Sequence, residues 1–289
     1  MQTLWLVLVA FLGASLGSFA NVVAHRVPLG LSIVRPASRC PSCKAPVPWW
    51  GNVPVLGWLF VRARCHTCKV PISARYPLVE LACGALAVAL WLQLAGPALV
   101  PPTMLAKVLV PWLLQLVFIV ALVTLTLIDL DWFLLPNEIT LPLALCGLVA
   151  AFAQTRGPTP AAAALGAVLG GLVPWVGMRL YGALTGREGL GGGDWKLLMA
   201  IGAWLGAMAL PFVVFAGALQ GLLTAALFRR DFALATLPTL PGEDAPAVSP
   251  DVVPFAKLAV PFGPFLALAA LEWLFFRGEI ASLWPLARS

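Results

Sequence analysis

Charged residues are scarce in this sequence. They make up 10% of its 289 residues, whereas hydrophobic residues make up 61%. A soluble globular domain carries charge on about a quarter of its residues, so this composition excludes that class. The chain is therefore predicted to be an integral membrane protein.

Apolar windows long enough to cross about 30 Å of hydrocarbon recur along the chain. They lie at residues 2–24, 77–95, 105–128, 138–154, 160–184 and 257–276. A further block, 196–228, is too long for one span and is interrupted at Ala209-Leu210-Pro211, which predicts a pair of short helices. The expected fold class is all-α, a polytopic transmembrane helix bundle of about eight spans. The first window lacks the basic start of a cleaved signal peptide, so we predict a retained anchor.

Acidic residues are absent from the segment 25–76. This segment holds eight basic residues and a charge of +8, while the rest of the chain sums to −2. The positive-inside rule makes the segment cytoplasmic and places the N-terminus outside. The expected organisation is a first transmembrane helix at 1–24, a cytoplasmic basic loop at 25–76 and a membrane-embedded domain at 77–289. A simpler role for the charge is topology signalling and attraction to anionic membrane lipid; no nucleic-acid partner is expected.

Four of the six cysteines form two C-x-x-C pairs within the basic loop. "CPSC" spans Cys40 to Cys43 and "CHTC" spans Cys65 to Cys68, with 21 residues between them. This spacing predicts a structural Zn²⁺ site of zinc-ribbon type, bound by Cys40, Cys43, Cys65 and Cys68. Two disulfides are the alternative, which the reducing cytoplasm disfavours. His66, inside the second pair, is expected at the surface, and Cys83 and Cys146, inside apolar windows, are expected to be buried thiols.

Two acidic motifs adjoin the apolar windows. Asp129 and Asp131 occur in "LTLIDLDWFLLPNEITLP", and Asp194 occurs in "GLGGGDWKLLMAIGAWLG". A carboxylate at a helix C-terminus faces the negative end of the dipole, so capping does not explain Asp129. Asp194 has the position of an N-cap, but the three preceding glycines would also let a substrate backbone approach it closely.

The positions of Asp129 and Asp194 suggest a joint chemistry. Each lies at the cytoplasmic end of a predicted span, so the two could meet at one depth in the bundle. Paired carboxylates in a desolvated site share a proton, and such a pair can activate water to attack a peptide carbonyl. The alternative is a proton-coupled membrane transporter in which the acids relay protons and the zinc loop is a docking module. A relay would place ionisable groups at several depths, whereas these two acids lie at one face.

Five separated motifs resemble the bacterial type IV prepilin peptidases, in the same order along nearly the whole chain. They are "GSFANVVAHRVP", the two C-x-x-C pairs, "ISARYPLVEL", "IDLDWFLLPNEITLP" and "GLGGGDWKLLMAIGAWLG". That family belongs to the GxGD membrane aspartyl proteases. The resemblance implies that Asp129 and Asp194 are catalytic and that Asp131 is a supporting acid. Many relatives carry another acid where this chain has Asn137, which we expect to be the N-cap of the next span.

The resemblance implies two successive reactions. The enzyme would cut the basic leader from prepilins or pseudopilins of type IV pilus or type II secretion systems, at the cytoplasmic face of the bacterial inner membrane. It would then N-methylate the new N-terminal residue with S-adenosylmethionine. No G-x-G-x-x-G motif follows a strand here, so the sequence does not locate the methyl-donor site, and the resemblance points only to the basic loop.

A basic leader would be repelled by the +8 loop. We therefore expect acids elsewhere on the cytoplasmic rim to hold the leader, with Glu80, Glu138 and Glu188 as candidates. The simpler alternative is that each of these glutamates caps a helix or pairs with a neighbouring arginine such as Arg75 or Arg187.

Overall fold

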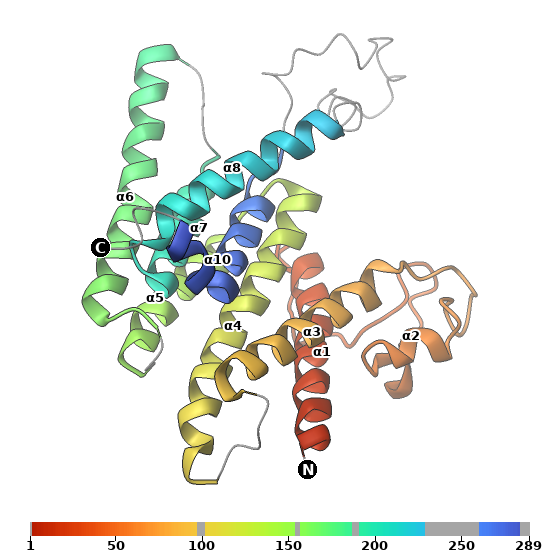
Figure 1. The fold of residues 1–289 in the computed structure, drawn as a ribbon. Coiled ribbons are helices and arrows are strands. Elements are labelled where there is room, and N and C mark those ends of the chain that lie inside the picture. The colour runs from red at the N-terminus through yellow and green to blue at the C-terminus, as the bar shows by residue number, and fades with distance from the viewer. Residues whose placement is uncertain (1, 97–101, 154–156, 187–190, 229–259, 284–289) are drawn as a thin grey trace.

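The fold is described by a computed structural model over residues 2–96, 102–153, 157–186, 191–228 and 260–283 (Figure 1). In these ranges every regular element is a helix, and strand-like pairing is limited to two isolated bridges in the loop. The helices are α1 (Gln2–Arg26), the 3₁₀ helix η1 (Trp49–Asn52), α2 (Leu56–Phe60), α3 (Arg75–Ala95), α4 (Pro102–Trp132), α5 (Asn137–Ala153), α6 (Pro160–Thr185), α7 (Asp194–Leu205), α8 (Ala209–Leu227) and α10 (Gly263–Leu283). The all-α prediction is confirmed.

Local sequence signals explain several helix ends. The Thr159 side chain accepts a hydrogen bond from Ala162 N, and Pro160 occupies the first turn of α6. Gly206 ends α7 with a φ of 83°, a conformation that favours glycine. The predicted break at 209–211 therefore lies slightly earlier, at 206–208, because Pro211 is accommodated in the first turn of α8.

The expected count of about eight spans is not confirmed. Within the described ranges, α1, α3, α4, α6 and α8 are long and apolar enough to cross a membrane, and α5 is a shorter apolar helix of 17 residues. The 12 residues of α7 are too few. α10 contains Glu272, Arg277 and Glu279, and it begins at Gly263 rather than at 257; residues 257–259 lie outside the described ranges.

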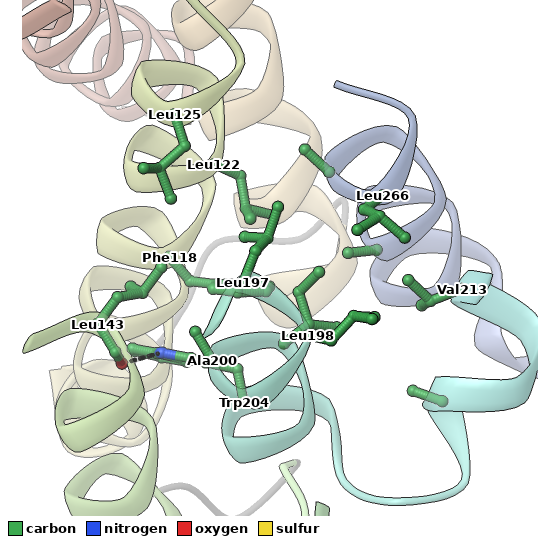
Figure 2. Packing of buried hydrophobic residues seen from close by; sticks show 14 of the residues in the cluster. Phe118, Leu122, Leu125, Leu143, Leu197, Leu198, Ala200, Trp204, Val213 and Leu266 are labelled. Carbon is green, nitrogen blue, oxygen red and sulfur yellow. Dashed lines mark hydrogen bonds between the residues drawn. The ribbon is translucent and has the colours of Figure 1, made fainter. Parts of the chain in front are cut away.

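Helix α4 takes part in two hydrophobic cores. On one side, Trp112, Leu116 and Ile119 pack with residues of α1 and α3. On the other, Phe118, Leu122 and Leu125 pack with residues of α5, α7, α8 and α10. Figure 2 shows Leu197 and Leu198 of α7 inside this second core, and it shows the hydrogen bond of 2.8 Å from Trp204 Nε1 to the Leu143 carbonyl. The short helix α7 is thus surrounded by longer ones.

Glycines allow two helix pairs to approach closely. In the α6–α7 pair, a Cβ added at Gly166 or Gly202 would collide with the backbone of the other residue. In the α1–α3 pair, a Cβ at Gly17 would lie 2.9 Å from Cys83 Cβ. Small residues at such interfaces are typical of membrane helices, because they permit backbone contact.

The two cysteines in apolar windows differ in their surroundings. Cys83 is buried against α1, as predicted. Cys146 is exposed on α5, so the prediction of burial is wrong for it. An apolar window does not reveal which helix face meets other helices and which meets lipid.

Residues 27–74 form a lobe that carries η1 and α2. The lobe lies beside α1 and α3, on the side of the molecule away from α6 (Figure 1). The indole Nε1 of Trp58 donates to the Ile72 carbonyl at 3.1 Å, which ties α2 to the end of the lobe.

Candidate active site and metal centre

Asp129 is a buried carboxylate near the C-terminal end of α4. Its side chain is 6% exposed, and Oδ2 accepts a hydrogen bond of 2.9 Å from the backbone N–H of Gly263. Gly263 is the first residue of α10, so the positive end of that helix faces the carboxylate. The sequence interpretation missed this partner. The signal available was "VPFGPFLALA", a glycine and proline directly ahead of an apolar run.

Asp194 is the first residue of α7 and is 7% exposed. The N-cap position of α7 is occupied by Gly193, so the N-cap interpretation of Asp194 is wrong. Its carboxylate instead accepts a backbone hydrogen bond from Gly191, and it lies near enough to Asp129 for their charges to interact. Two buried acids from α4 and α7 thus lie in one region.

Close contacts explain two of the three glycines before Asp194. A Cβ at Gly191 would lie 2.9 Å from Asp194 Oδ2, and one at Gly193 would lie 2.6 Å from the Cβ of Leu135. A Cβ at Gly192 would meet nothing within 4 Å. Leu135 is buried and also lies against Gly263, so this leucine packs between the segments that hold the two acids.

Asp131 faces away from this buried pair. It is exposed and forms an ion pair of 2.7 Å with Arg75. Arg75 also donates to the Leu127 carbonyl at 3.2 Å, so the start of α3 and the end of α4 lie together. The basic segment, which ends next to Arg75, and Asp129 are therefore at the same end of the bundle.

Asn137 does not have the predicted capping role. It is the first helical residue of α5, and the backbone N–H of Thr140 bonds to the carbonyl of Pro136. The Asn137 Oδ1 accepts a hydrogen bond of 2.5 Å from Lys196 Nζ. Since Lys196 follows Asp194 by two residues, this contact connects the beginnings of α5 and α7.

The three candidate acids for leader binding have different environments. Glu80 is buried, and its Oε2 accepts the backbone N–H of Val55 at 2.6 Å, so it is not on an open rim. Glu138 is exposed in the first turn of α5. Glu188 lies outside the described residues. Among the described residues, the geometry leaves Glu138 as the available candidate.

The two C-x-x-C pairs have the same local geometry. The Lys44 N–H donates to the Cys40 carbonyl at 3.0 Å, and the Lys69 N–H donates to the Cys65 carbonyl at 3.1 Å. Both lysines have positive φ, 58° and 61°. The backbone N–H of Cys43 lowers the pKa of the Cys40 thiol, and that of Cys68 lowers the pKa of the Cys65 thiol to about 6. Burial and the neighbouring thiols raise the pKa of the Cys68 thiol to about 11. The turns thus favour a thiolate, the form that binds metal, at the first cysteine of each pair.

The four sulfur atoms converge. All lie within 4.8 Å of one another, with 3.7 Å between the Sγ atoms of Cys40 and Cys68 and 3.9 Å between those of Cys43 and Cys65. None of the four is in a disulfide. A tetrahedral zinc with Zn–S bonds of about 2.3 Å requires sulfurs about 3.8 Å apart, so the donor set fits Zn²⁺. His66 is exposed and packs edge-on against Trp50.

A cavity of about 420 Å³ lies between this metal centre, α1 and the start of α3. Its lining combines cations, an acid, aromatic rings and a hydroxyl: Arg39, Arg64, Glu80, Trp58, Tyr76 and Ser18. Its volume is in the range of small-molecule sites. The cavity can therefore accommodate a ligand that has both charges and a planar ring.

Comparison with known proteins gives matches along most of the chain. A family model described as "Bacterial Peptidase A24 N-terminal domain" matches residues 11–94, and one described as "Type IV leader peptidase family" matches residues 116–226. A relative from Aeromonas hydrophila, named "Prepilin leader peptidase/N-methyltransferase", is 37% identical over 97% of this chain and 91% of its own. Relatives of the same name from Klebsiella pneumoniae and Neisseria gonorrhoeae are 44% and 35% identical, covering 69% and 81% of this chain and 84% and 87% of theirs. No solved structure matches. The relatives' names describe enzymes and give no support to the transporter alternative.

Proposed function

Because the chain belongs to the type IV leader peptidase family, we propose that it is a membrane aspartic endopeptidase that removes the basic leader of prepilins or pseudopilins. The observation that carries the proposal is the pair of buried carboxylates, Asp129 and Asp194, on two different helices. Backbone N–H groups of Gly263 and Gly191 hold these carboxylates. No other pair of acids in the described ranges is buried in one region.

The proposed chemistry is general acid–base hydrolysis. One carboxylate takes a proton from a water molecule, whose oxygen attacks the carbonyl carbon of the scissile peptide bond. The other carboxyl, protonated, donates to the carbonyl oxygen, and the peptide C–N bond then breaks as the leaving amine gains a proton. Two adjacent carboxylates in a desolvated site favour this division of roles, since they cannot both ionise easily.

The orientation we propose places this site on the cytoplasmic side of the bacterial inner membrane. The positive charges of 25–76 favour the cytoplasm for the lobe, with the N-terminus outside. The Arg75–Asp131 ion pair supports the same side for Asp129. In this orientation the exposed Glu138 is the acid we propose to bind the basic leader.

The second proposed activity is N-methylation of the new N-terminus, with S-adenosylmethionine as the methyl donor. The cavity of about 420 Å³ beside the metal centre fits this group. Arg39 and Arg64 would hold its carboxylate, Glu80 its cationic part, and Trp58 or Tyr76 its adenine ring. When bound, it would supply an electrophilic methyl group. The lobe would retain Zn²⁺ as a structural ion.

A cleavage assay with a candidate prepilin tests the peptidase proposal. Asp129→Asn and Asp194→Asn should each abolish leader removal, because a dyad needs both carboxyl groups, while membrane abundance stays normal. Asp131→Asn is the matched control: it removes an exposed ion pair worth about 1 kcal/mol or less, so cleavage should persist. Near-normal cleavage by either dyad variant would show the assignment to be wrong.

A further inference from the structure

The lobe presents an unusual apolar surface on η1 and α2. Trp49 is 81% exposed and Phe60 is 65% exposed, and Leu56 and Leu59 are half exposed. Leu56, Leu59 and Phe60 are at positions i, i+3 and i+4, so they share one face of α2. Another side of this helix packs inside the lobe, because Gly57 is buried against the backbone of Gly51. α2 thus turns its apolar face outward.

The Trp49 end of this apolar surface lies beside the apolar helix α1. A groove of about 370 Å³ is lined on one side by α1 residues that include Phe11, Ser15 and Phe19, and on the other by Trp49 and Pro54 of the lobe. Phe11 lies 15 residues before Arg26, where α1 ends, which is about 22 Å along the helix. The lobe is therefore alongside the span, as Figure 1 also shows, and part of it is level with the hydrocarbon and headgroup region.

Charge adjoins the apolar face. Arg62 is exposed two residues after Phe60, and the whole segment 25–76 contains no acid. Tryptophan is favoured at the membrane–water interface, where its ring is partly solvated by lipid. Basic residues beside such a face favour anionic headgroups, each contributing about 1 kcal/mol near the surface.

We propose that the lobe is docked on the bilayer, with Trp49, Leu56, Leu59 and Phe60 inserted into the interface next to α1 and with Arg62 bound to anionic phospholipid headgroups. This goes beyond the proposed function, on which it rests only for the identity of the leaflet. The occupant is lipid, because the positive charge complements the anionic cytoplasmic leaflet and because the groove is level with that leaflet.

Photocrosslinking of the full-length protein in phospholipid nanodiscs tests this surface without an activity readout. Trp49→p-benzoylphenylalanine and Leu59→p-benzoylphenylalanine should give phospholipid adducts by mass spectrometry. The same residue at Thr67, which is exposed at the metal-binding end of the lobe, is the matched control and should give none. Zinc content equal to that of the wild type would show that each variant is folded. Adduct yields at 49 and 59 no higher than at 67 would overturn the proposal.

The charge requirement is tested by changing the lipid. At position 59, the adduct yield should be about fivefold higher in phosphatidylglycerol than in phosphatidylcholine, the contribution of one basic residue near an anionic surface. Arg62→Gln should remove that difference. Equal yields in the two lipids would overturn the assignment of an anionic headgroup. Loss of lipid adducts in favour of adducts to an added prepilin peptide would show that the occupant is substrate rather than lipid.

Discussion

At the residue scale, the hydrogen bond from Gly263 to Asp129 fixes the carboxylate from a helix 134 positions further along the chain. A Cβ at Gly263 would lie 2.7 Å from Asp129 Oδ2. Gly263→Ala should therefore displace the carboxylate and greatly reduce leader cleavage. Gly278→Ala, in the same helix, is the control, since its Cβ would meet nothing within 4 Å. A kinetic assay with purified protein checks both, and equal activity of the two variants would contradict the role of Gly263.

A single residue, Glu138, is also proposed to bind the basic leader. If Glu138 binds a basic residue of the leader, Glu138→Lys should lose cleavage of the wild-type leader and recover it with a leader whose basic residue is changed to Glu. Glu279, exposed on α10, provides the control Glu279→Lys, which should cleave the wild-type leader normally. Failure of the swapped pair, together with unchanged cleavage by Glu138→Lys, would exclude Glu138.

At the scale of elements, the backbone contact between α6 and α7 sets the position of Asp194. Gly202→Ala would force the helices apart, and overpacking of this kind costs about 1–3 kcal/mol. Thermal unfolding in detergent should show a lower midpoint for Gly202→Ala and no decrease for Gly177→Ala, whose added Cβ has open space. The control is on α6, the helix that Gly202 contacts.

Helices could be predicted well from the sequence, because apolar windows and glycine or proline boundaries are local signals. The bounds of α3, α5 and α6 differ by at most two residues from the predicted windows 77–95, 138–154 and 160–184. What could not be predicted depends on contacts between distant residues. Examples are the Gly263 partner of Asp129, the Lys196 partner of Asn137 and the exposed face that contains Cys146. The approach of Asp194 to Asp129 was expected from their positions at span ends, whereas the close contacts of Gly191 and Gly193 were not.

At the scale of the whole molecule, the lobe has almost no core of its own. Of its residues 27–74, only Cys40 and Gly57 are buried, so a bound metal would supply most of its stability. Metal analysis should find one zinc per chain, and chelation should make the lobe sensitive to limited proteolysis. The paired variant Cys40→Ser/Cys65→Ser should lose the metal, whereas Cys146→Ser should retain it. Purified wild-type protein without zinc would contradict the metal assignment.

The shortness of α7 has a consequence for the path of the substrate. Its C-terminal Gly206 lies beside Pro158, in the connection between α5 and α6, and its 12 residues rise only about 18 Å. A hydrocarbon layer about 30 Å thick is deeper than this rise, so α7 is not a full span, and Asp194 at its first residue is buried among the longer helices. Because Asp129 and Asp194 are only 6% and 7% exposed, a peptide bond that reaches both carboxylates, and the water that hydrolyses it, must enter between the helices rather than react at the open surface.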